Sequence, residues 1–227
     1  MNKDLHSSTQ QGILVAIEGI DGSGKSLLAH NIANALLQQG YRVTATKEPG
    51  GTPLGQQLRT ILQTQPVPVD PLAEFLLFAA DRAQHVRDLI KPALAQGHIV
   101  ISDRLHYSSE CYQGFGRGLD RTLIQEVNQW VMGTVYPDLT LYVKIDPATA
   151  LERVVIRGQE RTSFEQRAFI ERVAHGFDIL FSPEERARNH RSDQLIVLNG
   201  TLSPEQLTSQ AIEAISALIN RRRKLDE

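Results

Sequence analysis

One segment of the sequence carries residues suited to binding phosphate groups. Residues 19–26 read Gly-Ile-Asp-Gly-Ser-Gly-Lys-Ser and match the pattern G-x-x-x-x-G-K-[ST] at every position. Glycines let backbone N–H groups curl around phosphate oxygens, while Lys25 can reach the β- and γ-phosphates and the Ser26 hydroxyl can ligate Mg²⁺. A glycine-rich turn with a chance lysine is the alternative, although an apolar run precedes the segment and an amphipathic one follows it. The predicted nucleotide-phosphate site comprises Gly19, Ile20, Asp21, Gly22, Ser23, Gly24, Lys25 and Ser26.

A second polar pair, Asp103 and Arg104, follows another apolar run. Ligands of open α/β sheets bind at the carboxyl ends of strands, which is where this pair is expected. An aspartate there can hold Mg²⁺ directly or through water, and an arginine can form paired hydrogen bonds with a phosphate. Asp21, inside the glycine-rich segment, leaves two interpretations open. Its carboxylate could bond to its own turn or accept a hydrogen bond from a sugar hydroxyl of a second substrate.

The elements that would position these residues alternate along the chain. Short apolar runs predict strands at 13–17, 41–46, 98–102, 139–145 and 195–198. Apolar residues at helical spacing predict helices at 25–39, 54–62, 72–95, 120–132, from Pro147, after the stretch 153–167, and after a capping box at 203–206. Five strands alternating with helices predict a doubly wound α/β domain with a parallel sheet.

The composition excludes several classes of protein. With 24 Lys and Arg against 26 Asp and Glu, the net charge of −2 gives no electrostatic reason to bind nucleic acid or an anionic membrane. No apolar run approaches the roughly 20 residues of a membrane span. The single cysteine, Cys111, cannot form an internal disulfide and is expected to be a buried packing residue in a cytoplasmic protein. We expect a flexible tail at 1–11, a single domain at 12–227, and Trp130 in its core.

Three further stretches resemble the thymidylate kinase family. They read KEPGGTPLGQQLR at 47–59, FLLFAADRAQH at 75–85 and DRLHYSSECYQGFGRG at 103–118. The last of these matches the family pattern D-R-x-x-x-S-x-x-A-Y-Q-G except that Cys111 replaces the usual alanine. The resemblance implies a P-loop nucleoside monophosphate kinase fold, in which helices flank a five-stranded parallel sheet that carries a small lid.

The resemblance also implies a role for each residue of an acceptor site. Phe78 would stack on thymine, and Arg82 would donate to O4 of the base, which favours thymine or uracil over cytosine. Residue type alone leaves core packing of Phe78 and a solvated surface position of Arg82 open. The other implied contacts are Ser109 at the base edge, Tyr112 on the deoxyribose, Asp21 on the 3′-hydroxyl, Glu48 beside the sugar and metal, and Arg59, Arg104 and Gln113 on the monophosphate.

Arginines are concentrated at 153–167, which reads RVVIRGQERTSFEQR. Phosphoryl transfer needs cations on the moving group and a cover that excludes water, and an arginine-bearing lid provides both. The resemblance implies that the lid supplies the catalytic arginine when the glycine-rich loop has none, as here. Arg157 and Arg161 are the first candidates and Arg153 is the next. The alternative is a solvated helix face whose arginines pair with neighbouring glutamates.

The resemblance implies that the chain transfers the γ-phosphoryl group of ATP to dTMP, giving dTDP and ADP for dTTP synthesis. Lys25, Arg104 and the lid arginines would be catalytic, and Ser26 and Asp103 would hold Mg²⁺. A cytoplasmic homodimer with no nucleic-acid or membrane partner is implied as well. The lid half departs from the family at 162–165 and at Lys144. A non-catalytic nucleotide-binding protein, or a kinase for another pyrimidine monophosphate, therefore stays open as the alternative.

Overall fold

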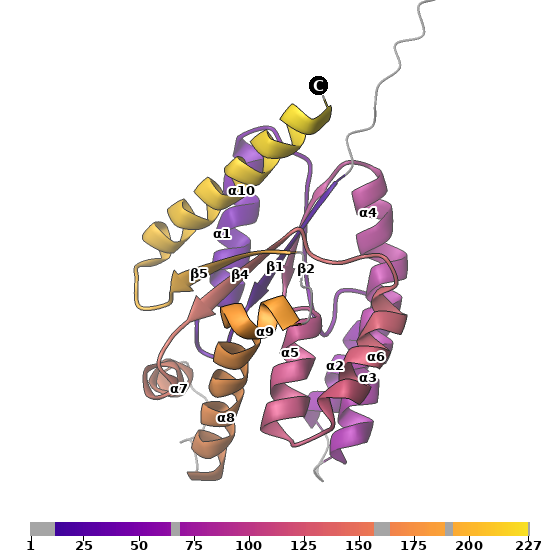
Figure 1. Cartoon of the computed structure of the whole chain (residues 1–227), viewed down its shortest axis with the longest axis vertical. Coiled ribbons are helices and arrows are strands. Elements are labelled where there is room, and N and C mark those ends of the chain that lie inside the picture. The colour runs from indigo at the N-terminus through magenta and orange to yellow at the C-terminus, as the bar shows by residue number, and fades with distance from the viewer. Residues whose placement is uncertain (1–11, 65–68, 157–163, 189–192, 227) are drawn as a thin grey trace, which may run out of the picture.

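The computed structural model, which describes residues 12–64, 69–156, 164–188 and 193–226, contains a parallel sheet between layers of helices (Figure 1). The strands of the described residues are β1 (Ile13–Glu18), β2 (Val43–Lys47), β3 (Ile99–Asp103), β4 (Leu139–Lys144) and β5 (Gln194–Asn199). They lie in the order β2-β3-β1-β4-β5, and every neighbouring pair is parallel. The predicted α/β fold with a five-stranded parallel sheet is confirmed.

The helices of the described residues are α1 (Lys25–Gln38), α2 (Pro53–Thr64), α3 (Pro71–His85), α4 (Lys91–Ala95), α5 (His106–Ser109), α6 (Arg121–Met132), α7 (Pro147–Ile156), α8 (Phe164–Leu180), α9 (Pro183–Arg188) and α10 (Pro204–Asp226). Two π-helical segments, η1 (Val86–Ile90) and η2 (Glu110–Gly116), join them. The single helix predicted over 72–95 is therefore divided by η1. This wider turn lies just before Pro92, whose ring has no N–H to continue the α-helical hydrogen bonds.

Alternate residues of β1 face opposite helical layers. Ile13, Val15 and Ile17 pack with buried residues of α1 and α10, which lie side by side in Figure 1. Leu14 and Ala16 pack with buried residues of η1, α4 and α6 on the other face. Because β1 is buried on both faces, its sequence is an unbroken apolar run up to Glu18. The central strand is thereby held rigidly beneath the glycine-rich loop that follows it.

Local predictions had mixed outcomes. Cys111 is fully buried as expected, and the capping box is present, since Gln206 N donates to Ser203 Oγ and Ser203 N donates to Gln206 Oε1. The placement of Trp130 in the core is wrong: its side chain lies on the outer face of α6 and is 88% exposed. Across the described ranges, no helix is both long and apolar enough to cross a lipid bilayer.

Candidate functional site

The glycine-rich loop connects the carboxyl end of β1 to α1, which begins at Lys25. Gly22 is required by close packing, because its φ is +83° and a Cβ there would lie 2.1 Å from the carbonyl oxygen of Ala150. Lys25 is buried; its Nζ donates to the carbonyl of Ile20 at 2.7 Å and lies 3.4 Å from Ser23 Oγ. Burial, together with the nearby charge of Arg104, lowers the pKa of Lys25 to about 8. The loop thus combines a helix N-terminus with a buried amine, an arrangement suited to phosphate.

Ser26 and Asp103 join the start of α1 to the end of β3. The hydroxyl of Ser26 donates to Asp103 Oδ2 at 2.5 Å. Asp103 Oδ1 is buried and has no hydrogen-bond partner among the described residues. A carboxylate oxygen without a partner, beside a hydroxyl oxygen, fits a hard cation such as Mg²⁺, which binds few protein oxygens and takes its other ligands from water and phosphate. The two residues therefore fit the metal that the resemblance implies.

Arg104 follows Asp103 in a strained backbone conformation, with φ at +76°. Its Nη1 donates to the carbonyl of Gly19 at 3.2 Å and to Ser108 Oγ at 2.9 Å. Its Nη2 donates to Asp21 Oδ1 at 2.5 Å and to Tyr112 OH at 3.0 Å. The guanidinium is thus held beside the glycine-rich loop, where it can meet a phosphate.

The carboxylate of Asp21 bonds to Arg104, and none of its hydrogen bonds in the described structure is to its own turn. Its backbone N–H donates to Tyr112 OH at 3.0 Å, so the loop also contacts η2. The Asp21 side chain is 60% exposed, which leaves part of the carboxylate accessible to a hydroxyl of a bound molecule.

Glu18 was missed by the sequence analysis. It is the last residue of β1 and is fully buried, and burial raises its pKa to about 7. Its Oε1 accepts from the N–H groups of Leu105 and Ser108 at 3.0 and 3.3 Å, and its Oε2 accepts from the Ser108 hydroxyl at 2.6 Å. Glu18 therefore supports Arg104 through Ser108. The sequence did contain one indication of its role, because Glu18 is a charged residue at the end of an otherwise apolar strand.

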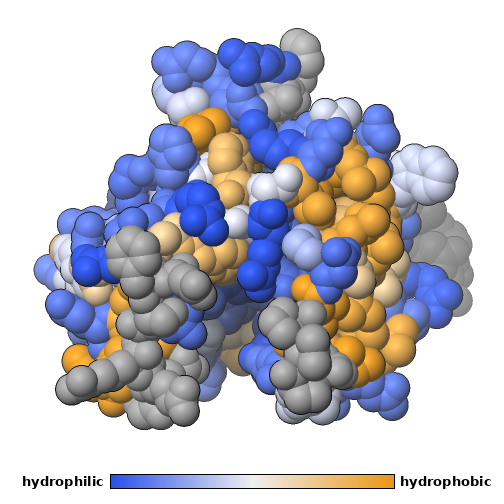
Figure 2. All heavy atoms as spheres, turned by 90° about the horizontal axis from the view of Figure 1, so that it is seen from below, coloured by the Kyte–Doolittle hydropathy of each residue, from blue (hydrophilic) through white to orange (hydrophobic). Residues whose placement is uncertain are grey.

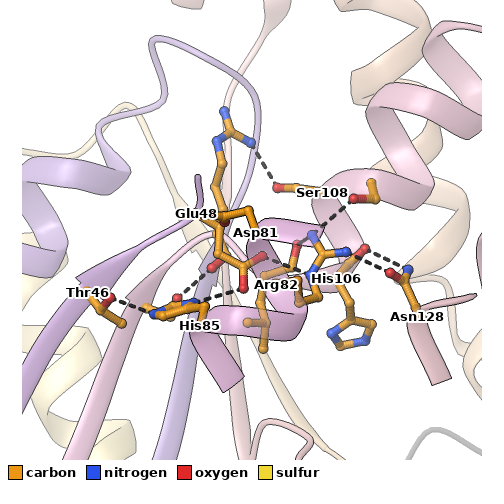
Figure 3. Close-up of polar contacts among 12 residues, drawn as sticks. Thr46, Glu48, Asp81, Arg82, His85, His106, Ser108 and Asn128 are labelled. Carbon is orange, nitrogen blue, oxygen red and sulfur yellow. Dashed lines mark hydrogen bonds and ion pairs between the residues drawn. The ribbon is translucent and has the colours of Figure 1, made fainter. Parts of the chain in front are cut away.

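A second buried network joins Glu48, just after β2, to α3 (Figure 3). Arg82 Nε donates to Glu48 Oε2 at 2.8 Å, and both side chains are almost completely buried. His85 Nδ1 lies 3.0 Å from Glu48 Oε1, and its Nε2 lies 2.7 Å from Thr46 Oγ1. The surface alternative for Arg82 is therefore wrong. Phe78, one turn before Arg82 on the same face of α3, is partly exposed.

A cleft of about 1180 Å³ brings many of the predicted residues together. Seen from below the view of Figure 1, the molecule is hollowed between its two halves (Figure 2). The predicted residues that line the cleft are Asp21, Gly22, Gly24, Lys25, Ser26, Glu48, Arg59, Asp103 and Arg104. Three residues of α8, namely Gln166, Phe169 and Ile170, also line it and were not predicted.

The other predicted acceptor residues do not line this cleft in the described structure. Phe78, Arg82, Ser109, Tyr112 and Gln113 are not among its lining residues. Ser109 Oγ accepts from Arg82 Nη2 at 3.0 Å. The amide of Gln113 donates to Glu74 Oε1 at 2.7 Å. Arg59, which does line the cleft, donates to the carbonyl of Pro49 at 3.1 Å.

A smaller cavity of about 300 Å³ is also lined in part by the glycine-rich loop, through Ser23 and Gly24. Ser23, Leu27, Leu202 and Leu207 are among its lining residues, whereas Ile20 does not line it and is packed in the core. Arg153 also lines this cavity, and its Nη1 donates to the carbonyl of Gly200 at 2.9 Å. The other two predicted lid arginines, Arg157 and Arg161, lie outside the described residues.

Known proteins resemble this chain in sequence over most of its length. The family model described as thymidylate kinase matches residues 17–208. A thymidylate kinase of Deinococcus radiodurans is 38% identical over 208 residues, which cover 91% of this chain and 97% of that protein. One of Thermosynechococcus vestitus is 38% identical over 96% of this chain and 93% of that protein, and one of a Synechococcus species is 44% identical over 73% and 83%. The chain therefore belongs to the thymidylate kinase family.

Proposed function

We propose that the chain transfers the γ-phosphoryl group of ATP to dTMP, giving dTDP and ADP, and that it serves dTTP synthesis in the cytoplasm. Membership of the thymidylate kinase family supports the reaction. The observation that carries it is the cleft in which Lys25, Asp103 and Arg104 meet around the glycine-rich loop. The acceptor phosphate is already an anionic nucleophile. Catalysis therefore requires positioning and charge neutralisation rather than a general base.

On the donor side, backbone N–H groups of residues 19–26 would bind the ATP phosphates, with Lys25 reaching the β- and γ-phosphates. Ser26 and Asp103 would hold Mg²⁺, which when bound would neutralise charge on the phosphate oxygens. The smaller cavity, lined largely by leucines and by Arg153, has the apolar character that suits the adenine ring. Arg153 would therefore contact the donor nucleotide.

On the acceptor side, we assign the monophosphate to Arg59, Arg104 and Gln113. The role of Arg104 is supported by its hydrogen bonds to Gly19 and Asp21 of the glycine-rich loop. Asp21 would accept from the 3′-hydroxyl of the sugar, with Glu48 nearby. Phe78 and Tyr112 would pack on the base and deoxyribose, while Arg82 and Ser109 would read the base edge. Gln113 must exchange its bond to Glu74 for a phosphate oxygen to take this role.

We also propose that residues 153–167 act as a lid whose Arg157 or Arg161 contacts the transferring phosphoryl group, with Arg153 as the third candidate. The described parts of that segment are the end of α7 and the start of α8. Helix α8 already reaches the cleft through Phe169 and Ile170. Movement at this point could therefore be transmitted directly to the acceptor site.

A panel of acceptors tests the reaction. In a coupled assay of ADP release with dTMP, dUMP, UMP, CMP and dGMP, we expect dTMP to be the best substrate. CMP and dGMP should be at least about a hundredfold poorer in kcat/KM, because a buried donor left without its acceptor disfavours the wrong base. Best activity with CMP or dGMP would overturn the assignment of the base-reading residues. Absence of transfer to every pyrimidine monophosphate would favour a non-catalytic nucleotide-binding protein.

We further propose that the chain forms a homodimer through adjacent faces of α2, α3 and α6. Exposed apolar side chains on these helices are Leu54, Ile61, Leu72, Leu76, Leu123 and Trp130. Figure 2 shows hydrophobic side chains gathered on its right, the side where these helices lie in Figure 1. Apolar faces of this kind commonly mark protein–protein contacts.

A charge placed in this face should separate the two subunits. We expect Leu76→Glu to convert a dimer into a monomer in light scattering coupled to gel filtration, because the interface would have to bury an unpaired carboxylate. The matched control is Leu37→Glu, which changes an equally exposed leucine on α1 and should leave the dimer intact. A wild-type protein that is monomeric at micromolar concentration would contradict the proposal.

A further inference from the structure

The guanidinium of Arg82 is held by acceptors that leave one of its N–H groups without a partner among the described residues. An arginine has five N–H donors in a fixed planar fork. Nε donates to Glu48 Oε2 at 2.8 Å, and Nη2 donates to the carbonyl of Leu105 at 3.3 Å and to Ser109 Oγ at 3.0 Å. Nη1 donates to Asn128 Oδ1 at 2.7 Å. The second N–H of Nη1 is therefore the donor left for a bound molecule.

Asn128 reaches this site from α6, a helix to which the sequence analysis assigned no functional residue (Figure 3). Its side chain is buried, with 3% exposed, and the orientation of its amide group is determined by its two neighbours. Arg82 offers only donors, so the amide oxygen must face it, and Nδ2 then donates to the carbonyl of His106 at 3.4 Å. An asparagine can satisfy both neighbours at once, whereas an aspartate can satisfy only the arginine.

We propose that Asn128 is a positioning residue for base selection, because it directs the remaining Nη1 donor of Arg82 toward the acceptor base. The inference rests on the proposed function, in which Arg82 reads an oxygen at the edge of thymine. Phe78 lies one turn before Arg82 on the same face of α3, so a base stacked there would bring its edge to this donor. Thymine and uracil present an oxygen at that edge and cytosine presents an amino group, so the direction of one N–H selects between them.

Replacement of Asn128 by leucine, which is similar in size, removes the acceptor for Nη1. The second N–H of Nη1 is then no longer held in one direction. We expect KM for dTMP to rise about tenfold, the effect of one hydrogen bond to a charged group, and the preference for dTMP over dCMP to fall. KM for ATP and kcat should change less than about threefold, since the donor side is untouched. Asn128→Asp keeps the contact with Arg82 and should hold KM for dTMP near the wild-type value, although it loses the bond to His106.

The matched control is Gln125→Leu, which removes a comparable amide one turn earlier on α6. Gln125 Nε2 donates to Glu110 Oε2 at 2.9 Å, and Gln125 is not among the hydrogen-bond partners of Arg82 in the described structure. A purely structural role for Asn128 predicts that the control and both Asn128 variants lower thermal stability alike and leave KM for dTMP unchanged. That outcome would overturn the proposal.

Two further measurements keep the result interpretable. If Asn128→Leu fails to fold, Asn128→Ala removes the acceptor with less apolar volume, and dTMP binding by calorimetry replaces the kinetic measurement. Failure of the proposed function is seen separately, as a wild-type protein with no transfer to dTMP. The inference about Asn128 fails if the wild-type protein is active but the Asn128 variants bind dTMP and dCMP as the wild type does.

Discussion

Replacing Lys25 by alanine should slow phosphoryl transfer to dTMP about a thousandfold, which is the scale of loss when a positioned charge on a developing anion is removed. Lys25 is the buried amine of the glycine-rich loop, and its Nζ is held by the carbonyl of Ile20 until a phosphate displaces it. In the variant, the γ-phosphoryl oxygens would lose the cation that the loop places beside them. The loss should appear in kcat, measured by ADP release at saturating ATP and dTMP.

The same substitution should not unfold the protein. Burial lowers the pKa of Lys25 to about 8, below its unfolded value, so the charged amine destabilises the fold below that pH and the penalty disappears as pH rises toward 10.5. At pH 7 the alanine variant should therefore melt no lower than the wild type. Lys91→Ala, at an exposed position on α4, is the control and should retain full activity. A Lys25 variant within tenfold of the wild-type rate would show that the loop does not act on the transferred group.

Replacing Arg82 by methionine should lower the free energy of unfolding by about 3–5 kcal/mol, the usual cost of leaving one partner of a buried ion pair alone. Glu48 would keep only His85 among its present ion-pair partners, and Asn128 would lose the donor that faces its amide oxygen. Equilibrium unfolding in urea measures the change, with all variants at one protein concentration because the proposed dimerisation would affect apparent stability. A loss below 1 kcal/mol would mean that the pair is not closed to water.

A double-mutant cycle separates the pair from its neighbours. Glu48→Gln removes the charge that Arg82 balances, so the double variant Glu48→Gln with Arg82→Met should be more stable than the sum of the single losses predicts. The sign of the coupling is the decisive observation. Additive losses would indicate that the two side chains do not depend on one another, despite the 2.8 Å contact between Arg82 Nε and Glu48 Oε2.

The central strands could be predicted from sequence because a strand that is buried on both faces consists of consecutive apolar residues. β1 and β3 are enclosed on both faces and read as apolar runs, and the glycine-rich loop is recognisable because it lies between such a run and a helix. The expectation for Trp130 failed for a reason that the sequence also contained. Ile124, Asn128 and Met132 recur every four residues and form the buried face of α6, which places Trp130 on the opposite face.

The polar networks could not be predicted, because their members are distant in the chain. Glu18 bonds to Ser108, 90 residues later, and Arg82 bonds to Asn128, 46 residues later. No local pattern marks such partners, since hydrogen-bond geometry arises only when the helices have packed on the sheet. The π-helical turns at 86–90 and 110–116 have the same origin, because the backbone widens to suit tertiary contacts rather than local propensity.

The strand order has a consequence for engineering. β2 and β3 lie on one side of β1, with the Glu48, Arg82 and Arg104 groups, while β4 and β5 lie on the other, with Arg153 and Gly200. The two substrates would therefore be bound on opposite sides of the central strand, and the glycine-rich loop, Asp103 and Arg104 would lie between them. Exchange of α3 alone, which carries Phe78 and Arg82 but neither Asp103 nor Arg104, for that of another monophosphate kinase would redirect the choice of acceptor and leave the nucleotide donor unchanged. In this architecture, the preference for the acceptor nucleotide could therefore be changed without changing the preference for the donor.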